Sequence, residues 1–190
     1  MQSDLFRHFA LPWILRVEGA FNDVAGDRGG ATNLGISLEF LRSLPDHDGD
    51  GFLDGDIDHD GDVDATDIRG MTEEAAGKAY HDYFWIPGRC DEMPAVVALC
   101  LFDGLVNHRP KTARMLVQRA LRIAPDGAIG PGTLAAAAKA EPHDFLADYL
   151  SYRAQFYGDL VRAHPDQAKF QRGWYRRLFL LQQYVLEAVS

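Results

Sequence analysis

The sequence predicts a mainly α-helical protein with a small β-hairpin and an acidic insert. Most segments repeat apolar residues at helical spacing, and Pro and Gly separate them. Residues 21–37 are instead rich in turn-forming Gly, Asn and Asp without that periodicity. Residues 46–67 hold ten of the 28 acidic side chains and neither Lys nor Arg. A chain of 190 residues that is 47% apolar is long enough to bury one core.

The first predicted helix covers residues 5–18 and ends before Gly19. A second begins after Thr72, whose hydroxyl is suited to cap it, and runs through "MTEEAAGKAYHDYFW". Pro94 opens the segment "AVVALCLFDGLVNH", which is apolar on nearly all sides and therefore predicts a central, buried helix. The remaining predicted helices cover residues 111–123, 132–140, 143–161 and 170–189.

The composition argues against a membrane-spanning protein and against a small disulfide-bonded one. No apolar run is long enough to span a membrane, and the N-terminal segment, with its early Asp4 and no small-residue cleavage site, does not resemble a signal peptide. Two cysteines cannot form a disulfide framework, and Cys100 lies in an apolar run that predicts a buried free thiol. Outside the insert the charge is nearly balanced, while residues 105–190 are mildly basic, which suits an anionic polymer or simply a solvated surface.

The acidic insert has the spacing of a calcium loop. In "DIDHDGDVDATD", residues 56–67, carboxylates recur at alternate positions and Gly61 supplies the sharp turn at position 6. Position 12 is Asp67 instead of the usual Glu, a variant that dockerin-type loops also show. The predicted ligands are Asp56, Asp58, Asp60, Asp62, Asp64 and Asp67, with Asp62 contributing its carbonyl.

A second, incomplete loop precedes this one. Its predicted ligands are Asp46, Asp48, Asp50 and Asp54, but Ile57 falls at position 12. We therefore expect one or two Ca²⁺ ions with a structural or regulatory role, because a cage of protein carboxylates leaves little room for substrate. A solvated acidic linker is the alternative for either loop.

The segment "VEGAFNDVAGDRGGATNLGIS", residues 17–37, contains the candidate catalytic groups. Glu18 closes an apolar helix, where a carboxyl shielded from water can serve as a general acid. Asp27 follows in a Gly-rich turn that favours the ionised form, and Thr32 can hold a water. Two carboxyls in contrasting environments are the machinery of glycoside hydrolysis. The alternatives are a surface charge at a helix end for Glu18 and a turn former for Asp27.

These motifs resemble glycoside hydrolase family 108, the N-acetylmuramidases of phage endolysins. The family pattern "EGGY.ND…D.GG.T..GI" is similar to "EGAFND" and "DRGGATNLGI" here. The resemblance continues in order through "MTEEAAGKAYHDYFW", "FDGLVN", the peptidoglycan-binding "DGAIGPGT" and "FQRGWYRR", and covers nearly the whole chain. Ala20, Phe21 and Arg109 depart from the family pattern, as does the aspartate insert.

The resemblance implies a helical, lysozyme-like lobe at residues 1–122, which includes the insert, and a peptidoglycan-binding helical part at residues 123–190. It implies hydrolysis of the β-1,4 bond between N-acetylmuramic acid and N-acetylglucosamine. Glu18 would be the general acid, Asp27 the second carboxylate and Thr32 the hydroxyl that positions water. Residues on later helices are candidates for substrate binding: Asp103, Asn107 and Trp174. For Asn107 a satisfied core amide, and for Trp174 a core anchor, are the alternatives.

We expect a monomer that acts on peptidoglycan glycan strands, with neither nucleic-acid binding nor membrane insertion. It would accumulate in the host cytoplasm until lysis and then reach the periplasmic wall. One alternative is a lytic transglycosylase that uses Glu18 alone. Others are a non-catalytic, calcium-dependent wall-binding module, favoured by the three departures, and a dockerin-like interaction protein.

Overall fold

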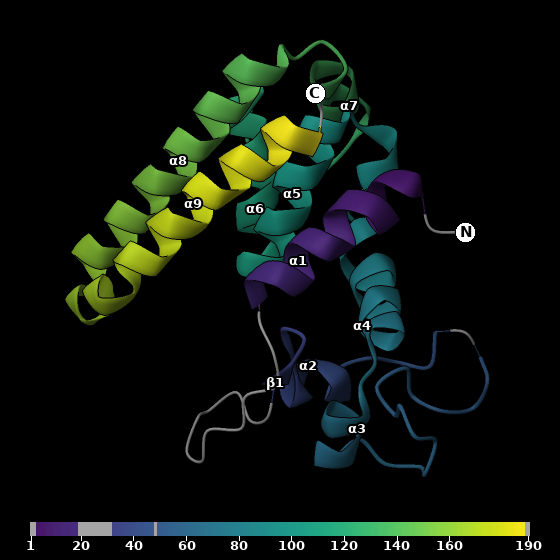
Figure 1. The fold of residues 1–190 in the computed structure, drawn as a ribbon. Helices are drawn as coiled ribbons and strands as arrows, with labels where there is room; N and C mark the ends of the chain where they lie inside the picture. The colour runs from purple at the N-terminus through teal and green to yellow at the C-terminus, as the bar shows by residue number, and fades with distance from the viewer. Residues whose placement is uncertain (1–2, 19–31, 48, 189–190) are drawn as a thin grey trace. The chain divides into compact units, whose positions relative to one another are not determined.

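The computed structural model describes residues 3–18, 32–47 and 49–188. These residues are mainly helical with one two-stranded sheet, so the predicted fold class is confirmed (Figure 1). The chain forms two compact units. The hairpin unit runs from Leu11 to Tyr83, and the helical unit comprises the chain up to Ala10 and from Phe84 onward. The predicted domain boundary after residue 122 stays a prediction.

The hairpin unit is assembled from short elements. Its helices are α1 (Leu11–Glu18), α2 (Leu38–Arg42), α3 (Ala65–Gly70) and α4 (Glu73–Tyr80). Strands β1 (Thr32–Asn33) and β2 (Ile36–Ser37) pair antiparallel, with Thr32 opposite Ser37. The two turn residues Leu34 and Gly35 have φ values of 50° and 80°, as a tight hairpin turn whose twist matches its strands requires.

Side-chain caps explain where the helices of this unit begin. Thr72 caps α4 as predicted, because its hydroxyl accepts a hydrogen bond from the Ala75 N–H at 3.1 Å. Ser37 caps α2 in the same way through Phe40. Asp64 and Asp67 form a reciprocal capping box on α3. Neither α2 nor α3 was predicted, since five or six residues are too few to show a helical period.

The helical unit is a bundle around one buried helix. Its α-helices are α5 (Ala95–Asn107), α6 (Pro110–Ala120), α7 (Pro131–Ala137), α8 (Pro142–Ala163) and α9 (Ala168–Ala188). Shorter turns complete the described chain: η1 (Phe6–Ala10), η2 (His81–Trp85), which continues α4, η3 (Cys90–Glu92) and η4 (Pro165–Gln167). The segment 96–105 of α5 is entirely buried, which confirms the predicted central helix.

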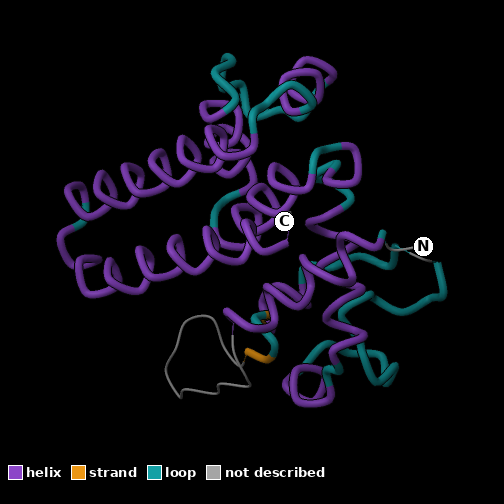
Figure 2. Tube along the Cα trace, turned by 45° about the horizontal axis from the view of Figure 1, so that its top comes forward, coloured by secondary structure: helices purple, strands orange, loops and turns teal. Residues whose placement is uncertain are grey.

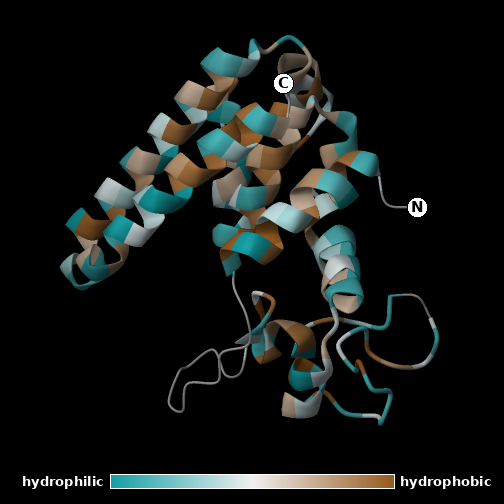
Figure 3. Ribbon diagram, viewed as in Figure 1, coloured by the Kyte–Doolittle hydropathy of each residue, from teal (hydrophilic) through white to brown (hydrophobic). Residues whose placement is uncertain are grey.

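Helices α8 and α9 run antiparallel and side by side, as Figures 1 and 2 show from two directions. Hydrophilic and hydrophobic residues alternate along both helices in Figure 3, as expected for helices that bury one face. Both helices begin within two residues of the predicted positions. None of the described helices is long and apolar enough to cross a membrane.

Aromatic packing closes the core of the helical unit. Phe6, Trp85 and Phe102 meet edge to face, with ring centroids 5.3–5.8 Å apart. The Tyr184 hydroxyl on α9 donates to the Phe9 carbonyl at 2.8 Å and ties the N-terminal turn to the bundle. Cys100 is a buried free thiol, as predicted, and burial raises its pKa.

Candidate functional site

Glu18 is the last residue of α1 and lies half-buried against the hairpin turn. A Cβ built on Gly35 would fall 2.4 Å from the Glu18 Cβ and 2.5 Å from the Tyr80 hydroxyl oxygen, so only glycine fits here. The Tyr80 hydroxyl donates to the Leu34 carbonyl at 2.8 Å. Helix α1, the hairpin turn and α4 therefore converge at Gly35, which packs against the base of the Glu18 side chain.

Thr32 lies in β1, beside the turn that contacts Glu18. It pairs with Ser37 and is partly exposed. The neighbouring Asn33 side chain donates to the Ile68 carbonyl at 2.9 Å, which anchors the hairpin on α3. Asp27 lies outside the described residues, and so do Ala20 and Phe21.

In the helical unit, Asp103 on α5 lies at the centre of a buried ionic cluster. Its carboxylate forms an ion pair with Arg153 of α8, and both side chains are completely buried. Arg177 of α9 contributes a second guanidinium, whose Nε lies 3.0 Å from the Asp103 Oδ1. Burial raises the pKa of Asp103, but the two guanidiniums outweigh burial and hold that pKa far below its usual range. The cluster thus joins three helices through one carboxylate.

Asn107 lies one helical turn beyond Asp103 on the same helix. Its side-chain oxygen accepts a hydrogen bond from the Tyr157 hydroxyl at 2.8 Å and a longer contact from Arg153 at 3.4 Å. The Trp174 ring stacks on Tyr157 with centroids 5.0 Å apart and is itself half-buried. The three predicted substrate-binding residues therefore share one network.

Sequence reasoning missed Arg153 and Tyr157, which connect these residues. Their four-residue spacing places them on one face of α8, but an Arg and a Tyr at that spacing are common on ordinary amphipathic helices. No local signal could have pointed to partners about fifty residues away on α5.

His108, which follows Asn107, is held neutral by its surroundings. Burial, together with the charge of Arg153, lowers the pKa of His108 from 6.5 to about 3. Because the folded-state pKa is depressed, the unfolded chain binds the proton first as the pH falls. The contribution of His108 to stability is therefore complete above about pH 6.5 and is lost between there and about pH 3.

We accordingly expect His108→Gln to reduce the loss of unfolding free energy between pH 7.5 and pH 4. Urea titrations of both proteins at several pH values measure this difference, because glutamine cannot take up the proton. Parallel pH profiles for wild type and variant would contradict the depressed pKa.

The motif "DGAIGPGT" folds around a buried glutamine of α6. The Gln118 amide nitrogen donates to the Asp126 carboxylate at 2.6 Å and to the Ala128 carbonyl at 2.9 Å. Its oxygen accepts the Gly127 N–H at 2.8 Å, and Thr133 at the start of α7 completes the network. Asp126 and Thr133 thus build the turn, and their residue types follow from this structural role.

The aspartate insert consists of two loops with the same internal hydrogen bonds. In the first loop, Asp46 accepts the Gly51 N–H at 3.1 Å, and in the second, Asp56 accepts the Gly61 N–H at 2.9 Å. In both loops the position-5 carboxylate accepts the N–H two residues later, at 2.9 and 3.1 Å. Gly51 and Gly61 have φ values of 97° and 100°, so each needs glycine. Asp48 lies outside the described residues.

Six carboxylates of the second loop form two triads. Within each triad, Asp56–Asp58–Asp60 and Asp62–Asp64–Asp67, one oxygen of each side chain lies within 4.8 Å of the others. The charge of Asp60, followed by desolvation, raises the pKa of Asp62, as expected for carboxylates in mutual repulsion. Asp67 is 1% exposed and accepts N–H groups from Ile57, Asp58 and Asp64. These bonds leave oxygen lone pairs for a cation, so the donor set fits Ca²⁺.

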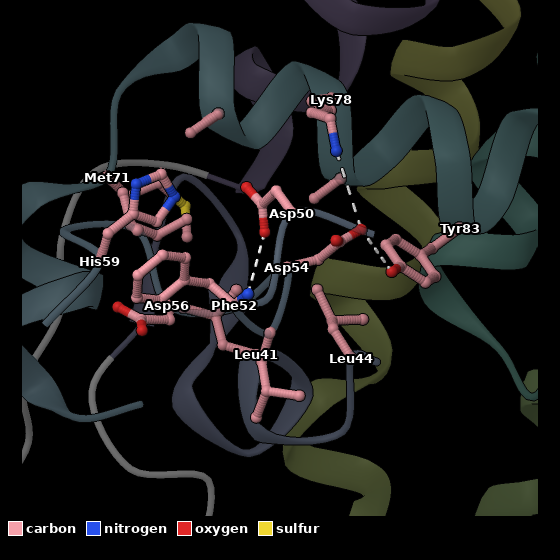
Figure 4. A pocket seen from close by; sticks show the side chains of 14 residues that line it. Leu41, Leu44, Asp50, Phe52, Asp54, Asp56, His59, Met71, Lys78 and Tyr83 are labelled. Carbon is pink, nitrogen blue, oxygen red and sulfur yellow. Dashed lines mark hydrogen bonds and ion pairs between the residues drawn. The ribbon is translucent and has the colours of Figure 1, made fainter. Parts of the chain in front are cut away.

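A cavity of about 280 Å³ is lined by residues of the insert, α2 and α4 (Figure 4). Asp54 at its wall accepts the Tyr83 hydroxyl at 2.7 Å and faces Lys78 at 3.7 Å. Phe52 of the first loop stacks on His59 of the second, with ring centroids 4.8 Å apart. The two loops therefore contact each other, and Asp54 attaches the insert to Lys78 of α4 and Tyr83 of η2.

Two known family models match successive parts of the sequence. Residues 11–108 match the model of glycosyl hydrolase 108. The chain belongs to the glycosyl hydrolase 108 family. Residues 112–179 match a predicted peptidoglycan domain. This member of the family is therefore a glycoside hydrolase that acts on peptidoglycan.

The fold of this glycosyl hydrolase has a solved counterpart. The structure of Brucella abortus SagA is similar with a TM-score of 0.73 and 24% sequence identity. The match covers 96% of this chain and 94% of that one, so the two proteins share a fold over nearly their whole lengths. None of the curated proteins matches the chain.

Proposed function

We propose that this enzyme hydrolyses the β-1,4 bond between N-acetylmuramic acid and N-acetylglucosamine, with Glu18 as the general acid. The observation that carries the proposal is the position of Glu18 at the end of α1, where the hairpin turn at Gly35 packs against the base of its side chain. A carboxyl held by its neighbours meets the glycosidic oxygen without first losing conformational freedom.

In the proposed reaction, Glu18 donates its proton to the leaving-group oxygen as the bond to the muramic acid C1 breaks. Asp27 acts as the second carboxylate, either as the general base that activates the attacking water or as the nucleophile whose glycosyl intermediate water then hydrolyses. The Thr32 hydroxyl positions that water. The two β-strands support this role for Thr32, because their pairing and the Asn33 anchor fix its backbone close to the turn that contacts Glu18.

We further propose that Asn107 and Trp174 bind the glycan, the first by hydrogen bonding and the second by stacking on a sugar face. Both side chains are half-buried and held by Tyr157, so they present a fixed surface at low entropic cost. Asp103 supports this surface from inside the helical unit.

The proposed biological role is that of an endolysin. The ordered resemblance to phage muramidases supports accumulation in the host cytoplasm, followed by action of the monomer on the periplasmic wall and lysis. Exposed Phe179 and Phe170 on α9 are scattered apolar residues of the kind that monomers commonly carry.

Digestion of purified Gram-negative sacculi tests the proposed reaction. The expected products are soluble fragments with reducing muramic acid ends, identified by mass spectrometry. Anhydro-muramic acid ends would instead establish a lytic transglycosylase. Binding to sacculi without release of fragments would establish a wall-binding module.

We also propose that the aspartate insert binds Ca²⁺ and is stiffened by it. Support comes from the spacing of residues 56–67, from the donor set, and from hydrogen bonds that repeat in both loops. A cation would relieve the mutual repulsion of these carboxylates, so its binding free energy adds to the stability of the hairpin unit.

Calcium is accordingly expected to raise the thermal unfolding temperature relative to chelator, by about 5 °C or more at a hundredfold excess over Kd. Asp60→Asn should abolish most of this shift, and the matched Asp50→Asn in the incomplete loop should retain most of it. Calorimetry on the same proteins counts the ions. No calcium-dependent shift and no binding heat in the wild type would disprove the calcium site.

A further inference from the structure

The hydrogen bonds around Asn107 fix which way its amide faces. A guanidinium only donates hydrogen bonds, so the Asn107 atom that faces Arg153 must be the oxygen. The Tyr157 hydroxyl approaches the same oxygen at 2.8 Å. Rotating the amide by half a turn would bring an N–H towards the Arg153 donor and is therefore disfavoured.

The Tyr157 hydroxyl can donate its hydrogen bond only to Asn107. It accepts a hydrogen bond from Arg153 at 3.0 Å, and its single proton goes to the Asn107 oxygen. The His108 Nε2, 3.4 Å away, can then only be a donor to that hydroxyl. The hydrogen bonds thus run in one direction: Arg153 donates to Tyr157, and Tyr157 donates to Asn107.

The consequence is that the Asn107 amide nitrogen points away from the network. Among residues 3–18, 32–47 and 49–188 this nitrogen donates to no protein acceptor, and it is not one of the buried atoms without a partner. The nitrogen is therefore at least partly accessible to solvent in this half-buried residue. The Asn107 oxygen therefore has its hydrogen-bond donors within the protein, and the Asn107 nitrogen is available to donate to a ligand.

The outward-facing N–H donor favours an electron-rich acceptor. Two guanidiniums, those of Arg153 and Arg177, lie against the Asp103 carboxylate in the same network. A sugar amide carbonyl, with its partial negative charge on oxygen, fits this donor.

We infer that Tyr157 and Arg153 are positioning residues that turn the Asn107 amide outward, where it binds the carbonyl oxygen of an N-acetyl group on the glycan. The inference rests on the proposed function for the identity of the glycan. It adds a specificity: the enzyme distinguishes N-acetylated from de-N-acetylated peptidoglycan through this amide.

Calorimetry on full-length Glu18→Gln, which should bind glycan without cleaving it, tests the inference. The probes are a tetrasaccharide of alternating N-acetylglucosamine and N-acetylmuramic acid and its de-N-acetylated counterpart. Adding Tyr157→Phe should weaken binding of the acetylated probe about three- to tenfold, the weight of one hydrogen bond between uncharged groups. Binding of the de-N-acetylated probe should not change.

Two further variants separate positioning from a general loss of structure. Tyr149→Phe removes another buried hydroxyl of α8, one that donates to the Cys100 carbonyl at 2.6 Å, and should leave both affinities unchanged. Asn107→Ala should weaken binding of the acetylated probe at least as much as Tyr157→Phe does. Combining the two substitutions should cause no further loss of affinity.

Equal effects of Tyr157→Phe on both probes, additive losses in the double variant, or no binding of the acetylated probe would overturn the inference. The proposed hydrolysis has its own readout, the release of fragments by the wild-type enzyme. Acetyl-dependent binding through Tyr157 without any such release would support the inference while disproving the proposed reaction.

Discussion

Glu18→Gln is expected to lower the rate of fragment release from sacculi by about 10²- to 10⁴-fold, the range for loss of a general acid. Glutamine has the shape of glutamate, so the packing of the side chain against Gly35 persists. It has no acidic proton to give to the leaving-group oxygen. The loss should therefore appear in kcat, with little change in the affinity for sacculi.

Glu39→Gln is the matched control, because Glu39 is an exposed glutamate of α2 in the same unit. It should retain wild-type activity. The thermal unfolding temperature of both variants should stay close to that of the wild type. Wild-type rates for Glu18→Gln would remove Glu18 from the chemistry, whereas a large drop in its unfolding temperature would attribute the loss to folding.

The second large effect concerns stability. Asp103→Asn should lower the free energy of unfolding by about 3–5 kcal/mol, the usual result of removing one partner from a buried ion pair. The substitution keeps the size of the side chain but leaves Arg153 fully buried without its counter-charge. Urea unfolding at pH 7 measures the difference. Asp148→Asn, which breaks an exposed pair with Arg122, should cost about 1 kcal/mol or less.

The same substitution has a defined pH dependence. The folded-state pKa of Asp103 is depressed, so its contribution to stability is complete above its ordinary value of 3.8 and is lost as the pH falls through the folded-state pKa. The difference between wild type and Asp103→Asn should therefore be constant near neutrality and shrink only in acid. A difference that already declines between pH 7 and pH 5 would contradict the ion-pair account.

Local features of the structure could be predicted from the sequence. Pro94 and the apolar run after it are enough to place a buried helix, and Thr72 is enough to start α4, because caps and periodicity act within a few residues. The repeated spacing of the aspartate loops is also local. The loops do form the turns at Gly51 and Gly61 that this spacing requires.

Features that depend on distant parts of the chain could not be predicted. The partners of Asp103 and Asn107 come from α8 and α9, fifty or more residues later, and nothing in either helix marks its Arg or Tyr as a partner. The contact of Gly35 with Glu18 likewise depends on how the hairpin packs on α1. Short helices such as α2 could not be predicted, because five residues are too few to show a helical period and the start of the helix is set by its capping residue.

The most direct test of the central claim is digestion of sacculi in water labelled with heavy oxygen, followed by mass spectrometry of the fragments. A hydrolase of the proposed bond transfers one oxygen from water to C1 of muramic acid. We predict heavy oxygen at that carbon in wild-type products, and labelled products released about 10²- to 10⁴-fold more slowly by Glu18→Gln. Label at C1 of glucosamine, or unlabelled anhydro ends, would contradict the proposed reaction.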